Sequence, residues 1–426
     1  MSHTRADLEI AAFAVDEVVE GTLTGRDGTT LLVASPQLAV GAGEPALAEA
    51  TVEVVRPGDR VRLTNVLDAV VPDVRADDPD ATFPGMLGGA WVDAASPRIH
   101  RLSGVAVLPV CDWQAAGLVA PEEFPSSFVD MAGPGQDRSP WGATSNLVLR
   151  CMPAPGVPVA EVDAAIRRAA LGLARALATT TLDGTPDDVR RAGAPGDVRR
   201  VGAPGDDDPD LPALCAILQV ASEGPLVDTF FDGENLRDLM PRVIDHRWLA
   251  AGRLTNGAYD WPGVRNTTAN YQDLALIRAL ASAHGETLRF AGTILAPGYL
   301  DTAEQKRQGA EASAVLAAEL GATGALCTTF SSGNSHTDTM LTVRALEMRG
   351  IAATALVCET NGGLTDHVAE ADSLVSTGNE DELVSVWTPD RIVGGGDGDA
   401  GRAVAMVHFL GSCVETGDGA WTAVPA

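Results

Sequence analysis

The second half of the chain alternates short apolar runs with helix-length segments, and this alternation limits the fold more than any other feature of the sequence. The runs have the residue types of β-strands, and the segments between them place apolar residues at helical spacing. The expected strands are 213–220, 289–295, 324–329, 353–358 and 373–376, and the expected helices are 272–283, 302–320, 337–349 and 365–370. Strands separated by helices form right-handed crossovers into a parallel sheet. We therefore expect an α/β fold, with a mainly parallel, Rossmann-like βαβ domain over residues 211–426.

The first half of the chain has a different pattern of residues. Over residues 1–150, β-branched runs alternate with Gly, Pro and Asp, which predicts a β-rich N-terminal domain. The expected strands include 8–13, 30–34, 52–55 and 104–110. Ala, Leu and Arg at helical spacing over 159–177 predict a connecting helix within residues 151–180. Residues 181–210 contain the near-repeat DVRRAGAPG-DVRRVGAPG and an acidic run without an apolar stripe, which predicts a flexible linker.

The charge of the chain excludes some classes of partner. It carries 30 Lys and Arg residues against 58 Asp and Glu residues, a net charge of -28. So acidic a surface repels nucleic acid backbones and anionic lipids, and we expect neither nucleic acid nor membrane partners. No apolar run reaches the length of a membrane span, and acidic residues interrupt the apolar stretch near the N-terminus. We expect a cytoplasmic protein that acts on a small molecule.

No metal or nucleotide motif is present. The six cysteines lie at long, irregular spacings without a Cys-x-x-Cys pair, and the glycine cluster at 394–398 lacks the spacing of phosphate-binding loops. The acidic and histidine side chains near the expected strand ends match no standard zinc pattern. We expect no bound metal.

Polar residues gather in the loops that follow two of the expected strands. The carboxyl ends of parallel strands are where such sheets bind ligands. In chain order, these residues are Asn334, His336, Asp338, Glu359 and Asn361. An imidazole with carboxylates supplies a proton donor and an acceptor, so His336, Asp338 and Glu359 are candidate catalytic residues, and the two asparagines are candidate substrate-binding residues. Helix capping and tight turns are the alternative roles for these loops.

Two cysteines lie at the ends of the same strands. Cys327 and Cys358 are candidate thiol nucleophiles if their surroundings favour the thiolate. The alternative role is that of small apolar residues in the core.

Several stretches in both halves of the chain carry a family resemblance. In the first half they are VVRPGDRVRLTNVLDAVVPDV, TFPG, RIHRLSGVAVL and FVDMAGPG, and in the second half they are ILQVASEGPLVDTFFDG, NTTANYQDLALI, RFAGTILAP, GNSHTDTML and LVCETNGG. Together they resemble the proprotein subunit of component B of glycine, sarcosine and betaine reductases, a family that includes the D-proline reductase proprotein. The resemblance implies a two-subunit component in which a cysteine ahead of an Asn-Thr-Thr run becomes a pyruvoyl group. That group forms a Schiff base with the substrate amine, and a partner's selenol or thiol takes the substrate carbon. Electrons come from thioredoxin-like donors.

This sequence departs from the family where the pyruvoyl group would form. The run Asn266-Thr267-Thr268 is present, but the positions where the family has cysteines fall near Tyr259 and Gly263. No cysteine occurs between Cys215 and Cys327, and residues 257–266 contain no serine or threonine. Making the group requires a side-chain nucleophile on Cβ, and a threonine would leave a 2-oxobutyryl group instead. We expect one intact chain without a pyruvoyl group and without another cofactor.

The resemblance and the departure together predict a function. We expect a subunit of a hetero-oligomeric reductase that cleaves a C–N or other C–heteroatom bond without an imine on itself, together with a thiol- or selenol-bearing partner. The candidate substrate-binding residues around the segment that lacks the family's cysteines are Tyr259, Asn266, Thr267 and Thr268. The alternatives are a non-catalytic scaffold or metabolite-binding subunit, and a non-redox enzyme such as a lyase that uses His336 and Asp338.

Overall fold

The computed structural model describes most of the chain. The described residues are 9–21, 24–34, 44–88, 98–113, 116–118, 128–191, 211–222, 228–237, 239–256, 267–298, 300–329, 334–357, 373–376, 380–383, 388–395, 405–408 and 422–424. Contacts divide the chain into two units. Unit 1 comprises Met1–Arg190, Ala251–Ala269 and Asp381–Val407, and unit 2 comprises Arg191–Ala250, Asn270–Glu380 and His408–Ala426. This division differs from the expected boundary after residue 210, because two later segments belong to unit 1.

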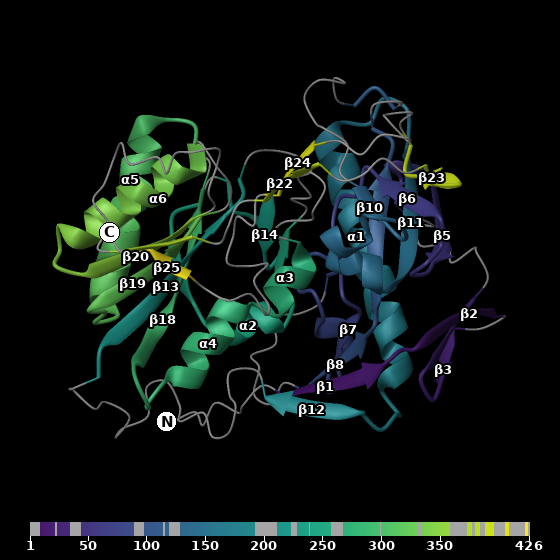
Figure 1. Cartoon of the computed structure of the whole chain (residues 1–426), viewed down its shortest axis with the longest axis horizontal. Helices are drawn as coiled ribbons and strands as arrows, with labels where there is room; N and C mark the ends of the chain where they lie inside the picture. The colour runs from purple at the N-terminus through teal and green to yellow at the C-terminus, as the bar shows by residue number, and fades with distance from the viewer. Residues whose placement is uncertain are drawn as a thin grey trace. The chain divides into compact units, whose positions relative to one another are not determined.

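Most of the regular secondary structure described in unit 1 is β-strand (Figure 1). They are β1 (Glu9–Ala14), β2 (Glu17–Gly21), β3 (Gly25–Asp27), β4 (Thr30–Ala34), β5 (Leu47–Val55), β6 (Val61–Thr64), β7 (Asp73–Arg75), β8 (Arg98–Ser103), β9 (Val105–Cys111), β10 (Phe128–Asp130), β11 (Ser145–Pro153), β12 (Asp188–Arg191), β17 (Leu254–Asn256) and β23 (Arg391–Val393). Four sheets have the orders β12-β1-β8-β7, β5-β11-β9, β10-β6-β23 and β2-β4-β3. The expected strands are confirmed as β1, β4, β5 and β9, because their β-branched runs pack one face into the core.

Helix α1 (Val159–Ala178) confirms the expected connecting helix and packs against β7 and β9. Short 3-10 helices lie at Pro79–Ala81, Gln136–Arg138, Pro140–Ala143 and Thr179–Thr181. The first residues of the expected linker, 181–210, are part of the folded structure of unit 1. Thr181 is buried, and Asp188–Arg191 form β12 beside β1, because the edge of β1 offers that stretch backbone hydrogen-bond partners. Residues 192–210 lie outside the described part of the chain.

A seven-stranded sheet forms the centre of unit 2 (Figure 1). Its strands are β13 (Ala213–Val220), β16 (Arg242–Ile244), β18 (Arg289–Pro297), β19 (Gly324–Thr328), β20 (Ala352–Val357), β21 (Ser373–Ser376) and β25 (Thr422–Val424), in the order β16-β18-β13-β19-β20-β21-β25. The pairings β18-β13-β19-β20-β21 are all parallel, and the two edge strands are antiparallel. The mainly parallel sheet is therefore confirmed.

The chain visits the five parallel strands in the order 2-1-3-4-5, with β13 first. This is the order of flavodoxin-like sheets and not of Rossmann sheets. The direction of winding reverses between β13 and β19. In doubly wound sheets, ligands bind outside the carboxyl ends of the strands at this reversal. The topology therefore points to the region beyond Val220 and Thr328.

Helices pack against this sheet. They are α4 (Ala275–Ala283), α5 (Ala303–Glu319) and α6 (Asn334–Glu347), and the remaining short elements are α2 (Arg247–Ala250), α3 (Thr268–Gln272), β14 (Thr229–Phe231), β15 (Glu234–Asn235), β22 (Glu380–Leu383) and β24 (Ala405–His408). Helices α5 and α6 pack on each other and on β18, β19 and β20. The expected helix 272–283 is divided between α3 and α4, and the expected helix 365–370 lies outside the described residues.

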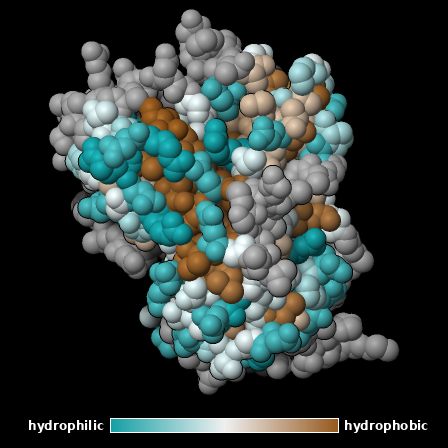
Figure 2. All heavy atoms as spheres, turned by 90° about the vertical axis from the view of Figure 1, so that its right-hand side faces the viewer, coloured by the Kyte–Doolittle hydropathy of each residue, from teal (hydrophilic) through white to brown (hydrophobic). Residues whose placement is uncertain are grey.

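Each unit has its own core. In unit 1 it is centred on Val55, Leu63, Ala106, Leu108 and Val148. In unit 2 it contains many alanines from α5 and β20, which allow the helices to approach the sheet closely. The described surface on the face in Figure 2 is mostly hydrophilic, with apolar residues in patches. No described helix is both long and apolar enough to cross a bilayer.

Candidate functional site

A buried carboxylate, Asp68, lies in unit 1 beside the residues that flank segment 257–266. Isolated bridges from Val66 to Val110 and from Val70 to Val107 hold its segment against β9. The Asp68 side chain is only 5% exposed. Its Oδ1 accepts hydrogen bonds from the backbone N–H of Ala69 at 2.7 Å and of Thr268 at 2.9 Å. Its Oδ2 lies 2.6 Å from the hydroxyl of Thr268, which donates to it.

Thr268 connects this carboxylate to the end of β17. Its Oγ1 accepts from the backbone N–H of Asn256 at 3.1 Å and lies 3.1 Å from the Asn256 carbonyl oxygen. Asn256, Thr267 and Thr268 are all fully buried. The structure thus brings one of the predicted substrate-binding residues, Thr268, to Asp68, a carboxylate that the sequence patterns do not indicate, and Thr267 is the buried residue next to it in the chain.

The carboxyl of Asp68 is suited to proton transfer. Burial raises the pKa of Asp68 from its ordinary value of 3.8 to about 7, although the hydrogen bonds from Thr268 and the charge of Arg167 act in the opposite direction. Both protonation states are therefore populated at neutral pH. A carboxyl in this state, hydrogen-bonded to a hydroxyl that a third group orients, has the arrangement of a general acid–base group.

The second candidate region is the carboxyl edge of the sheet in unit 2. Gln219, near the end of β13, donates two hydrogen bonds: its backbone N–H donates to Thr328 Oγ1 at 2.9 Å, and its Nε2 donates to the Ser335 carbonyl oxygen at 3.0 Å. A Cβ on Gly298 would lie 2.5 Å from the Gln219 side chain, so a glycine is required after β18. These contacts join β13, β18, β19 and the start of α6 at the point where the winding reverses.

An ion pair lies under this edge. Lys306 Nζ on α5 donates to Asp338 Oδ1 on α6 at 2.7 Å, and the two side chains are 9% and 6% exposed. Asp338 Oδ2 also accepts from the backbone N–H of Leu300 at 3.2 Å. A cavity of about 20 Å³ adjoins the pair, enough for about one water molecule. Its polar lining includes Gln219, Lys306, Ser313, Thr328, Asp338 and Thr342.

Asp338 is one of the predicted catalytic residues, but its partner Lys306 is not among the predicted site residues. A signal was available in the composition. Of the 30 basic residues in the chain, one is lysine and the remaining 29 are arginine, and the lysine is Lys306.

His336 and Asp338 are expected in one loop, where their side chains could act together. In the structure α6 begins at Asn334, so both residues lie in a helix. Residues two apart on a helix do not face each other. His336 is 1% exposed, and burial lowers its pKa below the ordinary value, which keeps the imidazole neutral at neutral pH. Its catalytic role stays a prediction.

The remaining predicted site residues differ in exposure, and several lie outside the described part of the chain. Asn334 is exposed at the first position of α6. Cys327 is 1% exposed within β19 and belongs to the apolar core of unit 2. Tyr259, Asn266, Cys358, Glu359 and Asn361 lie outside the described residues. Within the described part of the chain, no group of three or more His, Cys, Asp or Glu side chains is arranged to hold a metal ion.

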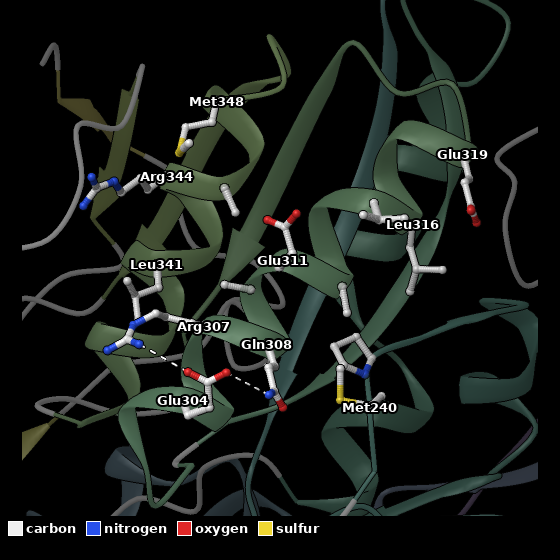
Figure 3. Close-up of a pocket in the computed structure, with 15 residues that line it drawn as sticks. Met240, Glu304, Arg307, Gln308, Glu311, Leu316, Glu319, Leu341, Arg344 and Met348 are labelled. Atoms are coloured by element: carbon white, nitrogen blue, oxygen red, sulfur yellow. Dashed lines mark hydrogen bonds and ion pairs between the residues drawn. The ribbon is translucent and has the colours of Figure 1, made fainter.

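A larger groove of about 890 Å³ lies over α5 and α6 (Figure 3). Met240, Leu316, Leu341 and Met348 line it, and at its rim Glu304 accepts from Arg307 and Gln308. None of the predicted site residues contributes to its lining. It is separate from the carboxyl edge of the sheet, since α5 turns the opposite face, with Lys306, inward.

Comparison with known proteins identifies the family. A family model described as glycine/sarcosine/betaine reductase component B subunits matches residues 6–414. The chain belongs to this family. Among its relatives, "Glycine reductase complex component B subunits alpha and beta" of Acetoanaerobium sticklandii is 25% identical over 91% of this chain and 88% of its own length. "Sarcosine reductase complex component B subunit alpha" and "Betaine reductase complex component B subunit alpha" of Peptoclostridium acidaminophilum are 25% and 26% identical, over 91% and 89% of this chain and 89% and 86% of their own lengths. No solved structure shows a significant match.

The thiol and hydroxyl side chains near Asn266-Thr267-Thr268 bear on whether this chain can form a pyruvoyl group. A pyruvoyl group derives from a cysteine or serine, and the sequence has neither between Ser222 and Ser282. The hydroxyls near the family's processing position belong to Thr255, Thr267 and Thr268. The Thr268 hydroxyl is bonded to Asp68, and Thr255 Oγ1 is buried without a hydrogen-bond partner among the described residues.

Proposed function

We propose that this chain is a subunit of a reductase complex that cleaves a C–N or other C–heteroatom bond of a small substrate without a pyruvoyl group of its own. The observation that carries the proposal is the family match over residues 6–414 in a chain with no cysteine between Cys215 and Cys327. A partner subunit that bears a thiol or selenol supplies the nucleophile. A thioredoxin-like dithiol then reduces the bond between the partner's sulfur or selenium and the substrate carbon: the carbon leaves with a hydrogen, the partner regains its thiol or selenol, and the dithiol becomes a disulfide.

The bond cleavage requires a proton at a defined place. The partner's thiolate or selenolate attacks the substrate carbon and forms a C–S or C–Se bond, while the heteroatom leaves with the bonding pair. Without an imine to activate it, the substrate must carry its own leaving group, such as a quaternary amine, and an amine that is not quaternary must be protonated as it leaves. Asp68 supports this step, because its pKa of about 7 allows it to hold or release a proton at neutral pH.

The absence of the carbonyl group is tested by intact-mass spectrometry of the purified chain, followed by reaction with a hydrazide probe. We expect one chain of 44.0 kDa and no hydrazone. Two fragments, or a hydrazone, would contradict the proposal. A Thr268→Ser variant is the matched control, since it offers a hydroxyl without the hindering methyl group. It too is expected to stay intact.

The reductase role is tested by producing the chain together with a candidate thiol or selenol subunit. We expect a complex that releases an amine from a panel of N-substituted substrates in the presence of a dithiol. An Asp68→Asn variant of the chain is expected to form the same complex and to release amine more slowly. If no complex forms with any candidate subunit, the scaffold or metabolite-binding role takes its place.

A further inference from the structure

The single lysine of this chain occupies a place where the protein otherwise uses arginine. Three buried ion pairs in the described part of unit 1 join arginine to aspartate: Arg62 to Asp130, Arg101 to Asp73, and Arg167 to Asp163, at 2.6 to 2.8 Å. In the part of unit 2 that the structure describes, a buried pair joins Lys306 to Asp338. A sequence with 29 arginines and one lysine thus places its one amine side chain in a buried pair.

Lysine and arginine are not interchangeable at such a place. Arginine remains charged and pairs with carboxylates through a rigid fork, which suits a structural ion pair. Lysine presents a compact amine, which can lose its proton and then act as a nucleophile. The cavity of about 20 Å³ leaves space beside the amine, so crowding alone does not explain the choice of lysine.

The surroundings of Lys306 single out this residue further. The buried face of α5 consists of Lys306, Gly309, Ala310, Ser313, Ala314 and Ala317. All of these except Lys306 are small. Lys306 also lies in the first turns of α5, where the helix dipole disfavours positive charge, so the ammonium depends on the carboxylate of Asp338.

The position of the amine is that of a ligand site. Lys306 and Asp338 line the same cavity as Gln219 of β13 and Thr328 of β19, the two strands between which the winding reverses. Ligands of doubly wound sheets bind at the carboxyl ends of the strands at this reversal. A buried amine with an adjacent proton acceptor at this place has the parts required for covalent capture of a carbonyl carbon.

We propose that Lys306 is a reactive amine that condenses with an uncharged aldehyde of one or two carbons, with Asp338 as the proton acceptor. The ammonium passes a proton to the Asp338 carboxylate, and the neutral amine attacks the carbonyl carbon. A C–N bond forms, the carbonyl oxygen takes up protons and leaves as water, and an imine remains on Lys306. The step needs no oxidant or reductant. It goes beyond the proposed reductase activity and does not depend on it.

The test is reductive trapping on the native full-length chain. Formaldehyde, and separately acetaldehyde, is added with sodium cyanoborohydride, which reduces an imine to a stable alkylated amine. The alkylated fraction of Lys306 is then measured by peptide mass spectrometry. We expect labelling of Lys306 that saturates with the concentration of the carbonyl compound. The N-terminal amine serves as an internal standard, and its labelling is expected to rise without saturation.

Two variants separate the amine from the ion pair. Lys306→Arg keeps a cation opposite Asp338 and is expected to fold, as judged by circular dichroism, with complete loss of labelling at this position. Asp338→Asn keeps the amine but removes the proton acceptor, and slower trapping is expected in the fraction that folds. If only the N-terminal amine is labelled in the native wild-type chain, or if Lys306 is labelled only after unfolding in urea, the pair is a structural link between α5 and α6 and the proposal is wrong.

Discussion

Unit 1 and unit 2 each bury a carboxylate in a candidate region of their own, and partner groups compensate the two carboxylates in different ways. Asp68 in unit 1 is hydrogen-bonded to a hydroxyl and two backbone amides. Asp338 in unit 2 is hydrogen-bonded to an ammonium and one backbone amide. Both residues are 5% exposed. The two aspartates therefore differ in the charge of their partners and not in their burial.

The difference determines what each aspartate can do. Neutral donors compensate only part of the cost of burying a negative charge, and the pKa of Asp68 rises to about 7. The carboxyl of Asp68 therefore exchanges a proton at neutral pH. At Asp338 a full positive charge lies 2.7 Å away, so the negative charge is paired and the amine opposite it is held in place. Proton transfer suits the first arrangement, and positioning of a nucleophile suits the second.

The largest expected effect follows from breaking the pair in unit 2. Asp338→Ala leaves the Lys306 ammonium buried without its counter-ion, and we expect a loss of about 3–5 kcal/mol in the free energy of unfolding. Replacing both partners, with Lys306→Met and Asp338→Leu together, is expected to recover most of this loss, because no uncompensated charge remains. Urea unfolding of the three proteins measures both effects. Equal stability of the single and double variants would show that the buried Lys306 ammonium costs little free energy when Asp338 is absent.

The second effect concerns the pH dependence of Asp68. Its folded-state pKa of about 7 lies above the unfolded value of 3.8, so between these pH values the folded state holds a proton that the unfolded state releases. The free energy of unfolding is therefore expected to fall as the pH rises from about 4 to about 7, by at most about 4 kcal/mol. In Asp68→Asn this contribution is absent. The measurement is the difference between the two proteins across the pH range, and a constant difference would contradict the assignment.

Much of the fold could be predicted because its signals are local. Apolar runs such as Ala213–Val220 and Thr30–Ala34 form strands with those bounds, since a run buried in a sheet needs β-branched or apolar residues at nearly every position. The order of the strands could not be predicted in this way. Whether β18 pairs on one side of β13 and β19 on the other depends on contacts between residues far apart in the chain. The sequence pattern predicts the start of this helix at residue 337, but α6 begins at Asn334. The polar residues Asn334 to Asp338 have no apolar periodicity that would indicate a helix.

The candidate site was predicted only in part, for a related reason. Thr267, Thr268 and Asp338 were singled out by their neighbours in sequence, but the groups that pair with two of them come from distant segments. Asp68 lies 200 residues before Thr268, and Lys306 lies 32 residues before Asp338. Asp68 stands in an apolar stretch with no motif around it, so only the folded chain reveals its partner. Lys306 could have been found from composition, because a residue type that occurs once in 426 positions is conspicuous.

The smallest expected effect tests whether the hydroxyl of Thr268 accounts for part of the difference between the two aspartates. Thr268→Val preserves the shape of the side chain but removes the donor to Asp68 and the acceptor for the N–H of Asn256. We expect a loss of about 1–3 kcal/mol at neutral pH, because buried polar groups lose their partner. Since the hydrogen bond from Thr268 lowers the pKa of Asp68, its removal is also expected to move the pH dependence of stability to higher pH.

Thr268→Ser is the matched control for that variant, because it retains the hydroxyl and loses only a methyl group. It is expected to keep the pH dependence of the wild type, with a loss of about 1 kcal/mol for the buried methyl. If the valine and serine variants have the same pH dependence, the hydroxyl does not influence the Asp68 carboxyl. Burial and the backbone amides alone would then set its pKa, and the contrast with Asp338 would rest on the cation of Lys306 and not on the hydroxyl of Thr268.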